Sequence, residues 1–169
     1  MKVNLGCGQA YMPGWVNVDA SPDVKADVSL DAVDFVRQYG DQVEEVYLGH
    51  VLEHLLPGDA LVLLTLLCER LPQGAVVSAV APDMAAIWAA YQRGEITNEQ
   101  LNASFIYSYV QPSHHRWCYD GPSLLELFRR AGFDDAEPID VLSWSPVYHK
   151  EGPESRWQCG VKATAKGTP

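Results

Sequence analysis

The first candidate site is a pair of glycines near the N-terminus, followed by an acid at the end of the next apolar run. The apolar run from Val3 ends in Gly6-Cys7-Gly8, which predicts a strand entering a tight turn. Glycines in such a turn let the backbone approach a ligand closely, because no Cβ stands in the way. The second run, residues 15–18, ends in Asp19, where doubly wound sheets hold the hydroxyl pair of a ribose. Together these features predict a cofactor site.

A dinucleotide is the weaker candidate for this turn. The dinucleotide fingerprint needs a third glycine where this chain has Tyr11, and a full helix to receive the pyrophosphate. Only residues 7–14 separate the two apolar runs, which leaves no room for such a helix. An extended chain of that length still reaches ~26–29 Å, so the two strands are expected to be parallel. A cofactor without phosphate loses little from the shorter connection.

A second candidate site is the segment 50–54, H-V-L-E-H. As H-x-x-E-H it matches the inverted zinc-protease string, in which two histidines on one helix bind zinc, and Glu126 would be the third ligand. However, the segment follows Gly49 at the mouth of a predicted strand, and Pro57 leaves it little room inside a helix. We therefore expect a loop beside the cofactor; local hydrogen bonding by Glu53 and His54 and a metal site are the alternatives.

Three strings, in this order, resemble the class I S-adenosylmethionine-dependent methyltransferases, in particular their small bacterial and phage type. They are residues 5–8 (L-G-C-G), 14–19 (G-W-V-N-V-D) and 50–54 (H-V-L-E-H). The resemblance covers most of the chain and implies S-adenosyl-L-methionine as cofactor and methyl transfer as activity. It also implies that Asp19 accepts from the ribose hydroxyls and that Asp31 and Ala32 meet the adenine, although Asp31 could equally cap a helix.

On this basis the segment after Gly49 lies beneath the methionine part of the cofactor. The expected cofactor residues are Leu5, Gly6, Cys7, Gly8, Asp19, Ala20, Leu30, Asp31, Ala32, Gly49, His50 and His54. A metal site built from Glu53 and His54 with His114 or His115 resembles one branch that methylates RNA ends. In that branch the first residue of the metal site is an acid, and in this chain His50 stands at its position. No metal is therefore expected.

A third candidate site is the segment 111–120, which gathers two imidazoles, a guanidinium and two aromatic rings before a predicted helix. The resembling family carries a similar H-H-x-W-x-Y-D segment over the open side of the cofactor pocket. Methyl transfer is an in-line displacement, so holding the nucleophile does most of the work. A hydroxyl nucleophile must also lose a proton, which a histidine can accept. We expect His114 or His115 to be catalytic; alternatively, Trp117 and Tyr119 fill a subsidiary core.

These sites need a scaffold in which strands alternate with helices. The pattern predicts an α/β three-layer αβα sandwich with a Rossmann-like, doubly wound, mostly parallel sheet and an antiparallel C-terminal strand. We expect one domain over residues 1–169 with a helical insertion at about 84–110. The predicted strands are 2–5, 15–18, 26–30, 43–48, 75–80, 139–144 and 157–163. The predicted helices are 31–40, 59–71, 84–92, 97–110 and 122–132.

Composition limits the partners and the location. The net charge of −10 and the pI near 4.8 argue against general nucleic-acid binding, which needs clustered Lys and Arg. The four cysteines form no C-x-x-C pair, and the apolar run 60–68 is too short to cross a bilayer. We expect a cytoplasmic protein that acts on a small molecule, with no membrane partner; the sequence predicts no particular oligomeric state.

The expected reaction is O-methylation, with N-methylation as the alternative, of a small molecule or of a sugar- or nucleotide-linked metabolite. Two functions from other classes are the alternatives. One is a non-catalytic cofactor-binding or regulatory subunit, which keeps the pocket and methylates nothing alone. The other is a zinc hydrolase built on the H-x-x-E-H string.

Overall fold

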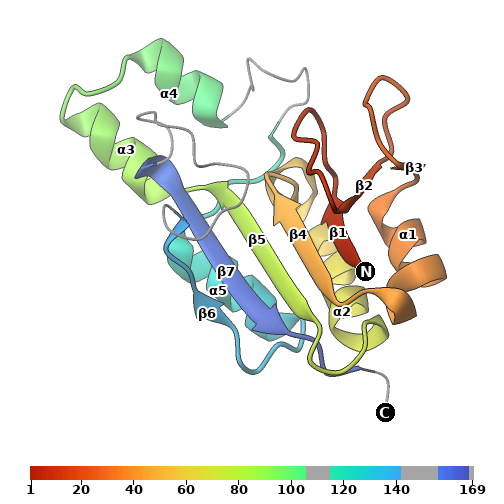
Figure 1. Ribbon diagram of the computed structural model, residues 1–169. Coiled ribbons are helices and arrows are strands. Elements are labelled where there is room, and N and C mark those ends of the chain that lie inside the picture. Colours follow the sequence, from red (N-terminus) through yellow and green to blue (C-terminus); the bar gives the residue numbers. More distant parts are fainter. Residues whose placement is uncertain (106–114, 142–155, 168–169) are drawn as a thin grey trace.

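A single mixed sheet organises the computed structural model, which describes residues 1–105, 115–141 and 156–167 (Figure 1). The strands run in the order β3-β2-β1-β4-β5-β7-β6. Their bounds are β1 (Lys2–Leu5), β2 (Val16–Asp19), β3 (Val28–Ser29), β4 (Glu45–Gly49), β5 (Val76–Pro82), β6 (Glu137–Pro138) and β7 (Gln158–Thr164). The first five strands are parallel, and β7 pairs antiparallel with both β5 and β6. The predicted mostly parallel sheet with an antiparallel C-terminal strand is confirmed.

The described helices are placed by the caps that their sequences supply. They are α1 (Ala32–Tyr39), α2 (Pro57–Arg70), α3 (Met84–Gln92), α4 (Asn98–Phe105) and α5 (Gly121–Arg130), with short 3-10 turns η1 (Gly40–Gln42) and η2 (Leu52–His54). Asp31, Asp83 and Asp120 cap α1, α3 and α5 through side-chain oxygens that accept from backbone N–H groups. Helix α2 begins two residues before the predicted start, because Pro57 is accommodated in its first turn.

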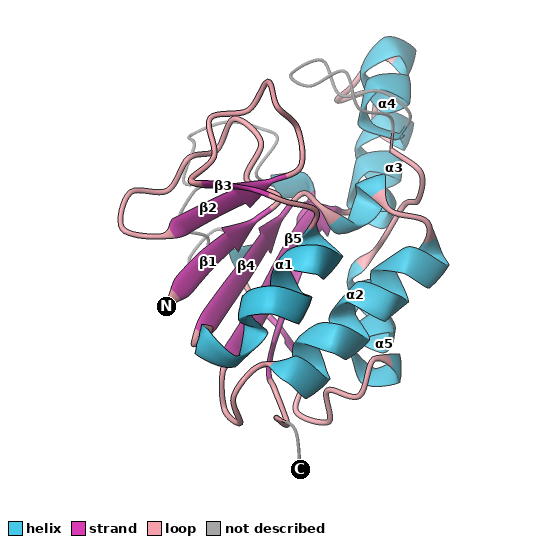
Figure 2. Cartoon of the chain, turned by 90° about the vertical axis from the view of Figure 1, so that its right-hand side faces the viewer, coloured by secondary structure: helices cyan, strands magenta, loops and turns pink. Residues whose placement is uncertain are grey.

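The sheet has two differently covered faces. Helices α1, α2 and α5 lie next to one another along one face (Figure 2), where their apolar side chains pack on the main core with Leu5, Val18 and Leu48. Tyr47 and Val80 point the other way, because successive strand residues alternate between faces. They contact side chains from the connecting segments: Met12, Trp15, Ile139 and Val141. Helices α3 and α4 lie beyond the carboxyl end of β5 in both views.

The short connection between β1 and β2 is a loop, and the two strands are parallel as expected, with Leu5 opposite Val18. Two predicted elements differ from the structure in their bounds. The strand predicted at 139–144 is wrong in position over the described part: β6 is Glu137–Pro138, and residues 142–144 lie outside the described residues. The helix predicted at 97–110 is described only as far as Phe105. None of the helices among the described residues has both the length and the apolar content that a bilayer span requires.

Candidate functional site

The glycine turn after β1 brings the backbone to the carboxyl edge of the sheet. Gly6 and Gly8 have φ values of 72° and 50°, in the left-handed region that favours glycine. The N–H groups of Gly6 and Cys7 both donate to the carbonyl of Val18, at 2.8 and 2.9 Å. A Cβ on Gly6 would lie 2.7 Å from Cγ2 of Val51. The turn therefore packs directly against the segment after β4, and a larger residue does not fit without movement.

Asp19 ends β2 and is bound to this turn. Its Oδ2 accepts from the N–H of Gly8 at 2.8 Å, and its Oδ1 accepts from the N–H of Ser21 at 2.9 Å. A carboxylate offers about four acceptor positions, so both oxygens can accept a further hydrogen bond from a ligand hydroxyl. Ala20 follows directly at the same edge. The position suits a ribose partner, and the contact itself stays a prediction.

The residues expected to meet the adenine lie at the start of α1. Leu30 precedes the helix, and its N–H donates to the carbonyl of Asp19 at 3.2 Å. Asp31 is the N-cap of α1, because its Oδ1 accepts from the N–H of Val33 at 2.8 Å. Ala32 is the first residue of the helix. The structure thus gives Asp31 a structural role and brings Leu30, Asp31 and Ala32 to the same edge as Asp19; contact with an adenine is untested.

A sharp bend after β4 starts the second candidate segment. A Cβ on Gly49 would lie 2.5 Å from Cε1 of Tyr47. The next residue, His50, has a φ of 57°, in a region where histidine is among the better-tolerated residues. Its N–H donates to the carbonyl of Val80 at 2.9 Å. The chain then turns through η2 at the carboxyl edge of the sheet, beside the glycine turn.

The geometry of η2 does not fit the inverted zinc-protease string. That string needs both histidines on one helix, whereas His50 lies before a three-residue 3-10 turn and His54 ends it. His50 Nδ1 instead lies 2.8 Å from Oε1 of Glu53. Glu126, the expected third ligand, is an exposed residue of α5. The zinc-hydrolase alternative therefore has no structural support.

The third candidate segment lies against η2 through Glu53. The carbonyl of Glu53 accepts from the N–H groups of Arg116 and Trp117, at 2.7 and 3.1 Å. The rings of His54 and His115 meet edge to face, with centroids 4.9 Å apart. The structure thus brings His115 to His54, whereas His114 lies outside the described residues.

The hydrogen bonding of His115 defines its tautomer. Its Nδ1 lies 2.9 Å from the carbonyl oxygen of Ser104 in α4. A carbonyl can only accept, so Nδ1 carries the hydrogen and a neutral ring has its lone pair at Nε2. Burial lowers the pKa of this imidazole, with the neighbouring carboxylate of Glu53 acting in the opposite direction. His115 is therefore held as a neutral base with a free lone pair.

Glu53 is the most buried charged group at this edge. Its side chain is 1% exposed. Burial opposes its ionisation, but the charge and hydrogen bond of His50 outweigh that effect and hold the pKa of the carboxyl below its usual value. Burial also raises the pKa of Tyr119 to about 12 and that of the Cys118 thiol. The segment therefore presents a carboxylate and a neutral imidazole, and no activated thiolate.

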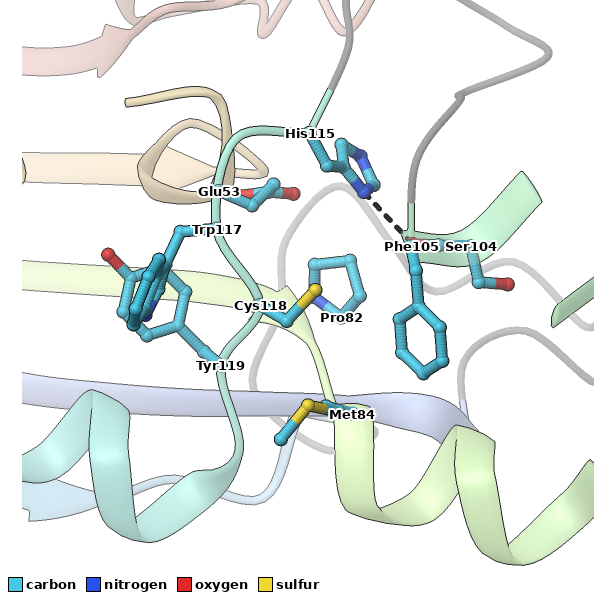
Figure 3. A pocket seen from close by; sticks show the side chains of 9 residues that line it. All are labelled: Glu53, Pro82, Met84, Ser104, Phe105, His115, Trp117, Cys118 and Tyr119. Carbon is cyan, nitrogen blue, oxygen red and sulfur yellow. Dashed lines mark hydrogen bonds between the residues drawn. The ribbon is translucent and has the colours of Figure 1, made fainter. Parts of the chain in front are cut away.

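A small cavity lies beside this group (Figure 3). Glu53 and His115 lie on one side of it, and Pro82, Met84 and Phe105 line the rest with residues of the segment 117–119. Its volume is about 10 Å³, which holds about one water molecule. The cavity is too small for a cofactor, but it adjoins two ionisable groups.

Two buried amides that the sequence analysis did not select hold the glycine turn in place. Asn17 Oδ1 accepts from Asn4 Nδ2 at 3.0 Å and from the N–H of Met12 at 2.8 Å. Asn17 Nδ2 donates to the carbonyl of Met12 and to Oδ2 of Asp27. The sequence signal was a polar residue at a buried strand position in each of two apolar runs. These amides replace the missing crossover helix as the support for the turn.

No family model matches the sequence, and no curated protein matches it. Solved structures do match. A methyltransferase dependent on S-adenosylmethionine (SAM) from Archaeoglobus fulgidus is 16% identical with a TM-score of 0.63, over 96% of this chain and 84% of that chain. A SAM-dependent methyltransferase from Thermotoga maritima, described as a possible histamine N-methyltransferase, is 14% identical with a TM-score of 0.63, over 98% and 82%.

A third solved structure is a complex between the Trm112 methyltransferase activator of Haloferax volcanii and a methyltransferase. It is 17% identical to this chain with a TM-score of 0.57, over 96% of this chain and 81% of the matched chain. At such identities the likeness establishes the fold and not the substrate. The chain has the Rossmann-like fold of the SAM-dependent methyltransferases, the class that its three sequence strings resemble.

Proposed function

We propose that this protein is a SAM-dependent methyltransferase that methylates an oxygen of a small molecule or of a sugar- or nucleotide-linked metabolite. The observation that carries the proposal is the hydrogen bond of 2.8 Å between the N–H of Gly8 and Oδ2 of Asp19. It joins the two parts of the expected cofactor site, the glycine turn and the acid, at the carboxyl edge of the sheet. Doubly wound sheets bind their ligands at this edge.

The residues at this edge fit S-adenosylmethionine, which supplies a methyl group on a positively charged sulfur. Gly6 and Gly8 keep the backbone accessible, and Asp19 retains acceptor positions for the ribose hydroxyls. The bend at Gly49 and His50 brings the following segment to the glycine turn. This segment, with His54, lies beneath the methionine part of the cofactor. A cytoplasmic location suits four cysteines that are all free.

His115 serves the acceptor. Its Nδ1 donates to the carbonyl of Ser104, which orients the ring and leaves the lone pair of the neutral ring at Nε2. The helical insertion at about 84–110, which contains α3 and α4, supplies that carbonyl and flanks the acceptor. In-line placement of the acceptor oxygen contributes most of the rate, and His115 promotes loss of its proton.

Labelled methyl transfer tests this function directly. Purified protein is incubated with methyl-labelled S-adenosylmethionine and fractionated metabolite extracts, and the labelled products are identified. With the acceptor in hand, His115→Ala should lower kcat on the order of 10²–10⁴-fold with near-normal cofactor affinity. Arg116→Ala, an exposed neighbour on the same segment, is the matched control and should leave kcat within about twofold. If His115→Ala turns over at the parent rate, the segment is structural.

A second candidate is a cofactor-binding subunit that needs a partner for activity. It is favoured by one observation: a structural neighbour was solved in complex with a methyltransferase activator. If the chain is such a subunit, it binds the cofactor, but no metabolite extract yields a labelled product until a protein fraction is added. Labelled product from the purified chain alone excludes it.

A further inference from the structure

We propose that Glu53, His54 and His115 form a binding site for one divalent transition-metal ion. Each of the three side chains offers one ligand atom, and these atoms all lie within 4.8 Å of one another. The sequence alone led us to expect no metal from Glu53 and His54 with His114 or His115, because His50 stands where the resembling branch has its first acid. The structure brings three of these side chains together: two adjacent residues of η2 and His115, from a segment about sixty positions away.

Glu53 is the group that most needs a positive partner. Its side chain is 1% exposed, and Oε1 is already bound to His50 at 2.8 Å. Its second oxygen, Oε2, is buried and has no hydrogen-bond partner. A buried acceptor on an ionised group is costly unless a donor or a cation satisfies it. A metal ion beside Oε2 would satisfy it and would use the charge that Glu53 carries.

His115 is oriented as metal-binding histidines usually are. Its Nδ1 donates to the carbonyl of Ser104 at 2.9 Å, which leaves Nε2 as the donor of an electron pair. Such a second hydrogen bond fixes the ring and raises the basicity of the ligating nitrogen. His50 plays the equivalent part for Glu53 by binding Oε1. Glu53 and His115 are therefore each oriented by a hydrogen-bond partner before a metal binds.

Two imidazoles and one carboxylate favour a transition-metal ion over Mg²⁺ or Ca²⁺, which prefer all-oxygen sites. A set of this composition is known to bind zinc with an open position. Metal-bound atoms at ~2.0–2.2 Å from a common ion lie at most ~4.4 Å apart, so the side chains need only a small closing movement. The cavity of about 10 Å³ beside Glu53 and His115 has room for one further oxygen ligand.

The site changes how His115 would act. If Nε2 binds a metal, it does not itself take the proton of the acceptor; the metal lowers the pKa of the acceptor hydroxyl instead. This consequence rests on the proposed function, whereas the metal site does not. Metal binding can be measured with no cofactor and no acceptor present.

Titration with a metal alone tests the site. The full chain is stripped with a chelator, dialysed, and titrated with Zn²⁺ in a calorimeter and with Co²⁺ by visible absorption. We expect one equivalent to bind, with Co²⁺ bands typical of nitrogen and oxygen ligands. Glu53→Gln, which keeps the shape of the side chain, and His115→Ala should each weaken binding on the order of 100-fold or more, since even the loss of an outer partner costs ~10–100-fold.

Glu126→Gln is the matched control, because Glu126 is the third ligand of the competing H-x-x-E-H arrangement. It should bind Zn²⁺ and Co²⁺ like the parent. The proposal is overturned if the folded parent binds no equivalent of either metal. It is also overturned if His115→Ala binds normally while Glu126→Gln does not. Melting curves show whether each variant is folded. If Glu53→Gln is unfolded, His115→Ala alone tests the site.

A variant of the cofactor site separates this proposal from the proposed function. Asp19→Ala should bind Zn²⁺ and Co²⁺ as tightly as the parent, because Asp19 is not among the three ligands. If the metal site exists and the chain binds no S-adenosylmethionine, only the proposed function fails. If the cofactor binds and the metal does not, only the metal site fails.

Discussion

Gly6 is constrained by both its backbone conformation and its surroundings. A left-handed conformation costs a residue with a side chain ~1–2 kcal/mol, and a Cβ there would also lie 2.7 Å from Val51. Gly6→Ala should therefore lower the free energy of unfolding by more than the backbone cost alone. Gly14→Ala is the matched control, because Gly14 has a φ of 82° and no atom within 4 Å of a built Cβ. Urea denaturation of both variants checks the difference.

The double variant Gly6→Ala with Val51→Ala refines this test. Removing the Val51 side chain relieves the contact and leaves the conformational cost, so part of the lost stability should return. Equal losses in Gly6→Ala and Gly14→Ala would contradict the close packing of the turn on the segment after β4.

The sequence predicted the glycine turn and Asp19 but not the residues that support them. Asn4 and Asn17 lie in short apolar strands and were counted as strand residues. Their role depends on which backbone groups of the loop 7–14 turn inward, and a sequence pattern does not contain that information. The hydrogen bonds of Asn17 to Met12 and Asp27 are visible only when the loop is folded.

At the scale of one element, Asp120 sets the start of α5. Its Oδ1 accepts from the N–H of Ser123 at 2.8 Å, and Ser123 Oγ accepts from the N–H of Asp120 at 2.9 Å. Asp120→Ala should lower the free energy of unfolding by ~0.5–2 kcal/mol at neutral pH. The hydrogen bonds of Ser123 hold the pKa of the Asp120 carboxyl below its ordinary value of 3.8.

The pH dependence of this effect follows from the lowered pKa. The carboxylate stabilises the fold fully above pH 3.8, the ordinary value, and the contribution is lost as the pH falls through the lower folded value. The difference between the parent and Asp120→Ala should therefore shrink in acid. Asp120→Asn, which keeps an accepting oxygen without charge, should show little of this dependence. A difference between parent and Asp120→Ala that grows as the pH falls would contradict the assignment. Urea denaturation at a series of pH values provides the measurement.

Elements with strong local signals were predicted well, whereas the position of one short edge strand, set by long-range pairing, was not. The cap that the sequence offered at Asp31 is confirmed as the N-cap of α1, because capping residues act within a few positions of themselves. The strand β6 was misplaced because its length is decided by where β7 passes beside it. Ile139 instead packs over Gly160, where a Cβ would lie 2.7 Å from Cγ1 of Ile139.

At the scale of the whole molecule, the candidate site joins segments that are far apart in the sequence. The carbonyl of Glu53 accepts from Arg116 and Trp117, and Ser104 orients His115. The sequence identified the H-V-L-E-H string and the later histidines as two candidate segments and joined them only through a resemblance to one branch of the family. The convergence of Glu53, His54 and His115 depends on long-range backbone contacts, such as those of the Glu53 carbonyl with Arg116 and Trp117, which a sequence pattern does not contain.

The central claim is that the glycine turn and Asp19 bind the cofactor, and calorimetric titration with S-adenosylhomocysteine, the demethylated cofactor, tests it most directly. Asp19→Ala should weaken binding tenfold or more, because hydrogen bonds from hydroxyls to a carboxylate contribute ~1.5–3 kcal/mol. Asp23→Ala, an exposed acid in the same loop, is the matched control and should bind like the parent. Melting curves without ligand verify that both variants are folded. Unchanged affinity in folded Asp19→Ala would contradict the account.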